Sequence, residues 1–277
     1  MDKEFWASIA KNDYAIPDGH KLSELTQTLF GYLSNTDSEL RDDIAYMVYA
    51  NWLKREMFTK DEIRWHVNEL FGNLDKDIGE TESDSVFLRT FSVLLLAEIV
   101  HNDNKKPLLD KDQIQTILAK GLWYLDAEKD PRGHIPVKGW AHTLAHTADL
   151  MLVLGKNRHT ENDDLEKILQ GIAKKLIHST NWVYIHGEDD RLANSAMMIL
   201  QRNLVTIEFL KTWFETFIKP EKPWNGAYMD EGQAKAFHNA RNFLRSLSEA
   251  LRTTDDLPEK ETIATIVYEA LDNLKPY

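Results

Sequence analysis

A chain of 277 residues without cysteine excludes a disulfide framework, a thiolate nucleophile and a zinc site with cysteine ligands. Its formal net charge of −12 would repel a phosphate backbone, so we expect no nucleic-acid partner. The charged first residues lack the apolar region of a signal peptide and the apolar runs are too short to cross a membrane, so we expect a cytoplasmic protein with no membrane partner.

Apolar residues recur at the spacing of an α-helix along most of the chain. Strict alternation of apolar and polar residues is almost absent, and residues 182–186 are the one candidate for a strand. Thr59 with Glu62, and Asp110 with Gln113, have the spacing of a capping box and predict two helix starts. We therefore predict an all-α fold and a single domain over residues 1–277. The clearest helical stripes are Leu22, Leu25, Leu29 and Leu33, then Ile114, Ile117, Leu118, Leu122 and Leu125, and then Ile263, Ile266, Val267, Ala270, Leu271 and Leu274.

Five predicted helices carry a basic residue at the start of a mostly apolar stretch. Successive basic residues lie 48, 53, 49 and 50 positions apart, a period that fits a helix pair with its connections. We predict about five stacked helix pairs in a HEAT- or armadillo-like α-solenoid, with an α/α toroid as the alternative. The five basic residues are Arg41, Arg89, His142, Arg191 and Arg241.

The helices between these five are expected at about residues 59–72, 110–127, 160–178 and 204–218, where they would form an outer layer. Each of the longer connections precedes a helix with a basic residue. If the pairs stack in parallel, these connections share one rim, beside the N-terminal ends of the inner helices. The connections are residues 72–85, 128–139, 179–189 and 219–230.

The segment GWAHTLAHTADL places His142, His146 and Asp149 on one face of a predicted helix. Imidazoles four residues apart can hold a metal ion, and the acid can serve as a third ligand or orient a histidine. The glutamate of a zincin motif is missing, because Thr143 stands in its place. Three interpretations compete: histidines packed in a seam between helices, general acid–base chemistry, and a divalent metal site. We expect no cofactor, with the metal as the alternative.

The preceding segment, EKDPRGHIPVKGW, is rich in polar residues for a short loop. Asp130, Arg132 and His134 lie beside a glycine that allows a tight turn or a close approach to a ligand. The segment is predicted to be a binding loop. The alternative is a structural loop in which Asp130 pairs with Arg132 and braces the next turn.

Arginines on apolar helices need carboxylate partners, because an unpaired buried charge destabilises a fold. Arg89 and Arg191 are expected to be mostly buried, with Asp149 or an acid of residues 188–190, such as Asp189, as the partner. Two interpretations compete for these arginines and for Arg241. Either they form a ladder of ion pairs between repeats, or they line a groove and bind an anionic ligand.

Trp224 and Tyr228 lie in a loop rich in proline and glycine on the expected rim. They either flank a ligand or pack the loop onto the body of the protein.

The segments SDSVFLRTFSVLLLAE, RGHIPVKGWAHTLAHTADL and GEDDRLANSAMMIL resemble a bacterial family catalogued as domain of unknown function 2785. The similarity covers roughly residues 35–250, and it implies no activity and no catalytic residues. A second resemblance, to α/α-toroid enzymes and lanthionine-cyclase-like proteins, rests on a turn of glycine and histidine. The zinc-binding cysteines of the cyclases are absent here.

Three functional interpretations follow, and whether the protein is an enzyme stays open. The first is an α-solenoid that binds a protein or peptide partner on its concave face or rim, which predicts a shallow groove. The second is a hydrolase or lyase in which His142, His146 and Asp149 act with residues of the rim, which predicts a closed pocket. The third is a purely structural polar network.

Overall fold

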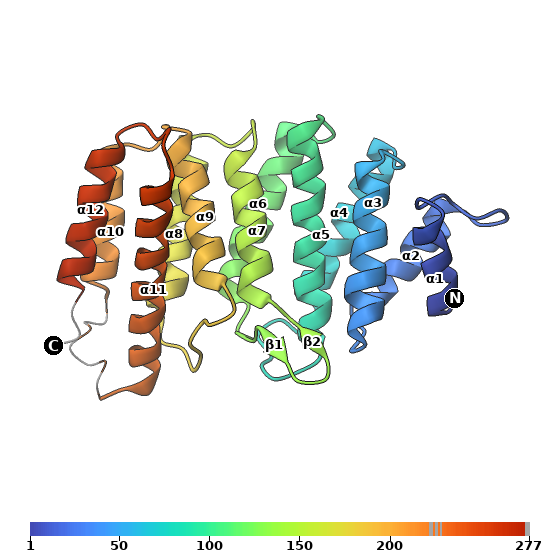
Figure 1. The fold of residues 1–277 in the computed structure, drawn as a ribbon, viewed down its shortest axis with the longest axis horizontal. Coiled ribbons are helices and arrows are strands. Elements are labelled where there is room, and N and C mark those ends of the chain that lie inside the picture. Colours follow the sequence, from blue (N-terminus) through green and yellow to red (C-terminus); the bar gives the residue numbers. More distant parts are fainter. Residues whose placement is uncertain (222–223, 225–226, 228, 275–277) are drawn as a thin grey trace.

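The computed structural model describes residues 1–221, 224, 227 and 229–274. Within these residues the fold is helical apart from one short antiparallel hairpin, which confirms the all-α prediction (Figure 1). The helices are α1 (Lys3–Lys11), α2 (Leu22–Tyr32), the π-helix η1 (Glu39–Tyr46), α3 (Met47–Lys54), α4 (Lys60–Asp75), α5 (Ser85–Lys105), α6 (Lys111–Ala127), α7 (Thr143–Lys156), α8 (Asn162–Ile177), α9 (Glu188–Gln201), α10 (Ile207–Ile218), α11 (Glu231–Thr253) and α12 (Lys260–Asn273). The hairpin is β1 (His134–Ile135) and β2 (Gly139–Trp140), in which His134 lies opposite Trp140.

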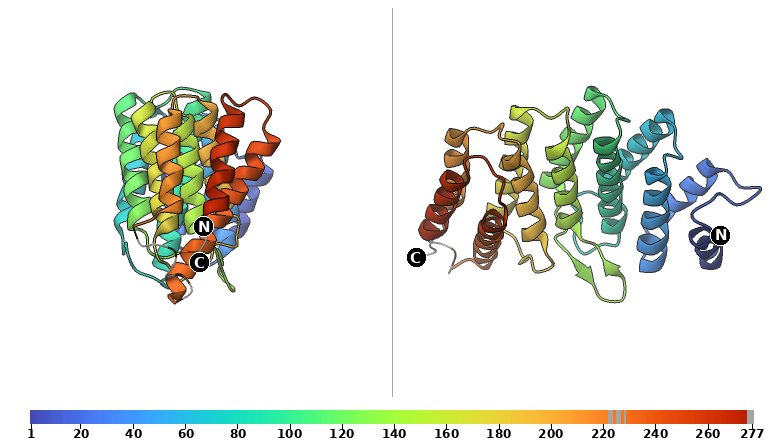
Figure 2. Two further views of the ribbon diagram at one scale, coloured as in Figure 1. Left: turned by 90° about the vertical axis from the view of Figure 1, so that its left-hand side faces the viewer. Right: turned by 45° about the horizontal axis from the view of Figure 1, so that its top comes forward.

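The five helices that carry the recurring basic residues form one layer, as their spacing predicted. The continuous helix η1–α3 packs against α5, α5 against α7, α7 against α9, and α9 against α11. Figure 1 shows this first layer as a row of helices in front, and Figure 2 shows the row from its end and from above. The near-constant spacing therefore marks structurally equivalent helices.

A second layer of α4, α6, α8 and α10 lies behind the first, close to the four segments predicted for it. In this layer α6 packs on α8, and α8 packs on α10. The predicted capping boxes begin two of these helices: the amide of Glu62 donates to Thr59 Oγ1 (3.2 Å), and the amide of Gln113 donates to Asp110 Oδ1 (2.9 Å). The ends of the row are covered by α1 and α2, which pack on η1, and by α12, which packs on α10 and α11.

The central helices of the first layer are apolar on more than one face. Helix α5 lies between α3 and α7 and also packs on α4, so 13 of its 21 residues are buried. A single apolar stripe would cover only one of these contact faces. Among the described residues α5 is also the one helix long and apolar enough to cross a membrane, but 67% of that apolar stretch is buried inside the protein. This burial is typical of the core helix of a globular fold.

The connections before the first-layer helices meet at one end of the molecule (Figure 1). Arg132 Nη2 donates to the carbonyl of Ser83 (2.6 Å), which joins the first connection to the second. Gly133 lies directly against the ring of His186 in the third connection. The amide of Thr180 donates to the carbonyl of Gly232 (3.2 Å) at the start of α11. We call residues 76–84, 128–142 and 178–187 the rim.

Candidate functional site

His142 lies at the point where the rim enters α7. It is the residue before the helix, with a left-handed backbone (φ 51°), so the prediction that it shares a helix face with His146 and Asp149 is wrong. The cause is a chain reversal: the carbonyl of Gly133 accepts from the amides of both Ala141 (2.7 Å) and His142 (2.9 Å). These bonds turn the chain before the first helical residue.

An aromatic cluster surrounds Trp140 at the end of the hairpin. The ring of His142 stacks on the indole, with ring centres 4.2 Å apart and planes 1° from parallel. His134 and His186 meet the indole edge to face, at 4.8 and 5.4 Å, and His146 lies 5.4 Å from His142. The rim thus brings together four histidines from the hairpin, the start of α7 and the segment before α9.

Burial keeps the inner histidines of this cluster neutral. It lowers the pKa of His142 to about 4, and the charges of Arg191, His186 and His134 add to the effect. Burial also lowers the pKa of His146 well below its usual value. Within the described residues, the buried Nδ1 atoms of His142 and His186 have no hydrogen-bond partner.

His146 is anchored in the seam between α5 and α7. Its Nδ1 lies 3.1 Å from Oγ1 of Thr90, and that hydroxyl donates its proton to the carbonyl of Ala141 (2.7 Å). Because the hydroxyl proton is already used, His146 Nδ1 must carry the proton of this contact. The geometry favours the seam interpretation for His146.

Asp149 and Arg191 form an ion pair between α7 and α9, with Arg191 Nη1 2.6 Å from Asp149 Oδ2. The predicted partner is therefore correct, and Arg191 is partly buried, with 37% of its side chain exposed. Burial raises the pKa of Asp149 against the opposing charge of Arg191. Nearby, Tyr46 donates to Glu98 Oε1 (2.7 Å), which extends this polar band from α9 to η1.

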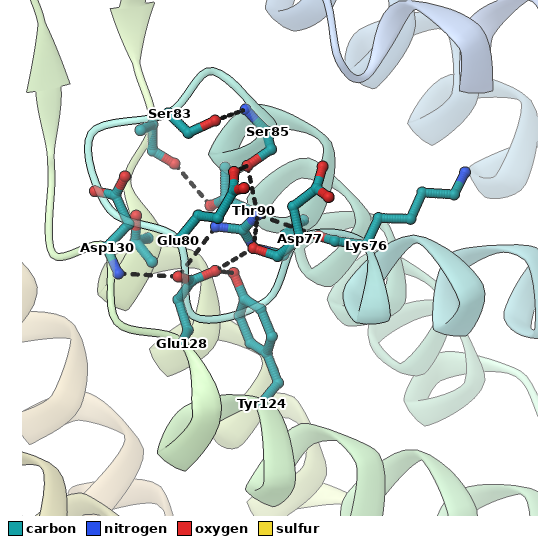
Figure 3. A network of polar contacts seen from close by, with 12 residues as sticks. Lys76, Asp77, Glu80, Ser83, Ser85, Thr90, Tyr124, Glu128 and Asp130 are labelled. Atoms are coloured by element: carbon teal, nitrogen blue, oxygen red, sulfur yellow. Dashed lines mark hydrogen bonds and ion pairs between the residues drawn. The ribbon is translucent and has the colours of Figure 1, made fainter.

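Arg89 is fully buried, as predicted, but its carboxylate partner is Glu128 and neither Asp149 nor residues 188–190. Arg89 Nε donates to Glu128 Oε2 (2.6 Å) and Nη2 donates to Oε1 (3.2 Å) (Figure 3). The prediction failed because Glu128 follows α6 of the second layer, 39 positions away in sequence. The second fully buried arginine, Arg41, donates to three backbone carbonyls, those of Asn35 (2.7 Å), Lys138 (2.9 Å) and Trp140 (3.3 Å). Both arginines brace rim segments, so neither contributes to a ladder that runs from repeat to repeat.

The residues of the predicted binding loop brace one another. Arg132 donates through Nε and Nη2 to the buried carboxylate of Asp130, at 2.6–3.0 Å. The same carboxylate accepts from the amide of Glu82 (3.1 Å). These bonds favour the structural interpretation for Asp130 and Arg132, whereas His134 joins the aromatic cluster.

The other predicted binding residues lie apart from Trp140. Asp189 contacts Ser246 on α11 (3.4 Å). Arg241 is partly exposed on α11, and its Nε has no hydrogen-bond partner among the described residues. Trp224 is buried, and its Nε1 donates to the carbonyl of Phe217 (2.6 Å), so it packs the loop onto the body of the protein. Tyr228 lies outside the described residues.

His142 and His146 lie together, with ring centres 5.4 Å apart, whereas Asp149 pairs with Arg191. Across residues 1–221, 224, 227 and 229–274, no three histidine or acidic side chains are grouped as ligands of one metal ion. The contacts that organise the site come from residues that sequence reasoning missed: Thr90, Glu128, Trp140 and His186. Of these only Trp140 carries a sequence signal, as an aromatic residue beside a glycine in a polar loop.

A family model described as protein of unknown function (DUF2785) matches residues 74–248. No curated protein and no solved structure matches the chain. The matched range runs from the end of α4 into α11 and contains the candidate residues described above, except Arg41 and Tyr46.

Proposed function

The chain belongs to the DUF2785 family, and we propose that its two helix layers form an open α-solenoid that binds a protein or peptide partner in the cytoplasm. Support for an open stack over a closed toroid comes from the ends of the row, since α1 and α12 lie at opposite ends of the long axis (Figure 1). Stacked helix pairs expose a long surface, which suits the recognition of an extended partner.

The main support for the proposal is that three apolar side chains of the rim are exposed to solvent, two of them on the hairpin. Val137 at its tip is fully exposed, and it has a left-handed backbone (φ 71°) that is unfavourable for a β-branched residue. Trp140 is 40% exposed, and Ile185, beside His186 of the same cluster, is 72% exposed. Exposed apolar residues on a rigid support are typical of a binding surface. We call these three residues the rim patch.

Polar contacts hold the hairpin in place while the rim patch stays exposed. Arg41 on η1 donates to the carbonyls of Lys138 and Trp140, and Lys138 Nζ pairs with Asp84 (2.7 Å). A prearranged loop loses little conformational entropy when a partner binds, so more of the contact energy contributes to affinity.

Basic groups on α9 and α11, the first-layer helices that follow α7 in the row, indicate the chemistry of the partner. Arg191 donates to Asp149 through one guanidinium nitrogen, Nη1. On α11, which packs against α9, Arg241 and Arg245 lie four residues apart and have no acidic partner among the described residues. We therefore propose a partner segment with an apolar side chain for the rim patch and acidic residues for these arginines.

The enzyme alternative receives less support from the electrostatics. A general base works best with a pKa near the working pH, whereas the pKa of His142 is about 4 and that of His146 is also strongly lowered. Neither imidazole matches the proton-transfer role that a hydrolase or lyase would require.

A peptide-display selection against the purified chain tests the proposal. We expect enriched peptides to combine an aromatic or aliphatic residue with nearby acids, and we expect Trp140→Ala to weaken the binding of a selected peptide at least about tenfold. Trp123→Ala is the matched control, because Trp123 on α6 is similarly exposed (38%) and lies away from the rim patch. Equal losses for both variants, or no saturable binding, would contradict the proposal.

A further inference from the structure

A cavity of about 470 Å³ lies on the second-layer side of the rim, between the C-terminal ends of α6 and α8. Its volume falls in the range of sites for small molecules, roughly 300–1,000 Å³. Its wall includes three lysines, Lys129, Lys174 and Lys175, and two acids, Asp126 and Glu128, together with Pro131 and Tyr184. None of these residues belongs to the rim patch.

Two of the three ammonium groups bind only neutral acceptors. Lys129 Nζ donates to the carbonyl of Asp126 (2.8 Å), and Lys175 Nζ donates to the carbonyl of Glu128 (2.7 Å). Lys174 has a carboxylate partner, since its Nζ lies 2.8 Å from Asp126 Oδ1. Among the described residues, no carboxylate forms an ion pair with Lys129 or Lys175.

The second acid of the wall, Glu128, is paired outside the cavity. The carboxylate of Glu128 accepts from Arg89. It also accepts from the hydroxyl of Tyr124 (3.1 Å) and from the amide of Asp130 (2.9 Å), as Figure 3 shows. Its charge is therefore matched within the buried network. The cavity wall keeps an excess of positive charge in a protein whose net charge is −12.

The surroundings of Lys175 disfavour the charged form of its ammonium group. Burial and, to a smaller extent, the charge of Lys129 lower the pKa of Lys175 to about 8, although Glu128 and Asp126 act in the opposite direction. The other groups around the cavity are Lys174, His178 and Tyr184, and burial raises the pKa of the Tyr184 phenol. An anion inside the cavity would stabilise the charged form of Lys175.

We propose that this cavity binds a small organic dianion, with Lys129 and Lys175 contacting its anionic group and Pro131 and Tyr184 packing against its apolar part. Charged hydrogen bonds from two ammonium groups supply the affinity, and the apolar wall selects an organic ligand over a free inorganic ion. The alternative role for these lysines is to satisfy the carbonyl ends of α6 and α8.

Isothermal titration calorimetry on the full chain at pH 7 tests this site with phenyl phosphate, phthalate and inorganic phosphate. We expect saturable binding of at least one organic dianion, and weaker binding of inorganic phosphate. Comparison of the first two probes distinguishes a phosphate monoester from a dicarboxylate. Lys129→Met and Lys175→Met should each weaken binding about tenfold, whereas Lys167→Met, on the same helix as Lys175 but outside the cavity wall, should leave it unchanged.

Proton uptake provides a second measurement. At pH 8.5 part of the Lys175 population has lost its proton, so binding of a dianion should take up a proton, and the apparent enthalpy should depend on the ionisation enthalpy of the buffer. This dependence should be smaller at pH 6.5, where Lys175 is already charged. If Lys175→Met lowers the melting temperature, Lys129→Met is the deciding variant, because Lys129 is exposed.

Three results would overturn the proposal: no saturable binding of either organic dianion at millimolar concentration, unchanged affinity in Lys129→Met, or an enthalpy at pH 8.5 that is independent of the buffer. The outcome is independent of peptide binding at the rim patch. Trp140→Ala should leave the affinity for the dianion unchanged.

Discussion

Arg89 and Glu128 form a two-pronged, fully buried ion pair that ties the start of α5 to the segment after α6. The same arginine donates through Nη1 to the carbonyls of Lys76 (3.2 Å) and Asp77 (3.0 Å), so one guanidinium holds two rim segments together. Its five donors and fixed geometry suit this task, which a lysine could not perform.

Replacing Arg89 with Met should therefore destabilise the protein strongly. Glu128 would stay buried without its cationic partner, and such a loss costs about 3–5 kcal/mol. Arg191→Met should cost much less, because the Asp149–Arg191 pair is partly exposed to solvent. Urea unfolding of both variants measures the difference. Equal losses would show that the polar band around Arg191 is as important for stability as the buried pair.

Stability should depend on pH through His142. Its pKa is about 4 in the folded protein and about 6.5 in the unfolded chain, so between these values the unfolded state binds more protons. The free energy of unfolding should therefore fall as the pH drops from 6.5 to 4. His142→Asn should remove part of this loss, on the order of 2 kcal/mol.

Urea midpoints at pH 4.5, 5.5 and 7 check this prediction, with the exposed His238→Asn as the control variant. A pH dependence in His142→Asn as steep as in the unchanged protein would show that His142 titrates normally in the folded state.

Gly133 should be essential for the packing of two rim segments. A Cβ atom there would lie 2.2 Å from His186 Nδ1, so Gly133→Ala must displace the His186 ring and should cost about 1–3 kcal/mol. Adding His186→Ala removes the clash and should recover part of that loss. Gly31→Ala, in α2 with no neighbouring atom within 4 Å, is the matched control. Strictly additive effects in the double variant would contradict the contact.

The helices were largely predictable from sequence, because burial against neighbouring helices imposes a helical period on the apolar residues. The repeat also places equivalent residues about 50 positions apart. Local capping chemistry also predicted the starts of α4 and α6, since those hydrogen bonds join residues three apart. Such features depend on short stretches of chain.

The contacts of the candidate site depend on distant segments, so the sequence alone did not reveal them. The left-handed conformation of His142 arises from two bonds to Gly133, and the partner of Arg89 comes from the other layer. The π-helix at Glu39–Tyr46 was also not expected, because its apolar spacing does not distinguish it from an α-helix.

The most direct test of peptide binding at the rim is Val137→Asn, measured for stability and affinity in parallel. Val137 is fully exposed in a left-handed conformation that Asn adopts more readily, so the variant should be as stable as the unchanged protein or more stable, by about 1 kcal/mol. If the rim patch binds a partner, the affinity for a selected peptide should nevertheless fall several-fold. Unchanged affinity in a variant of equal or higher stability would contradict the account.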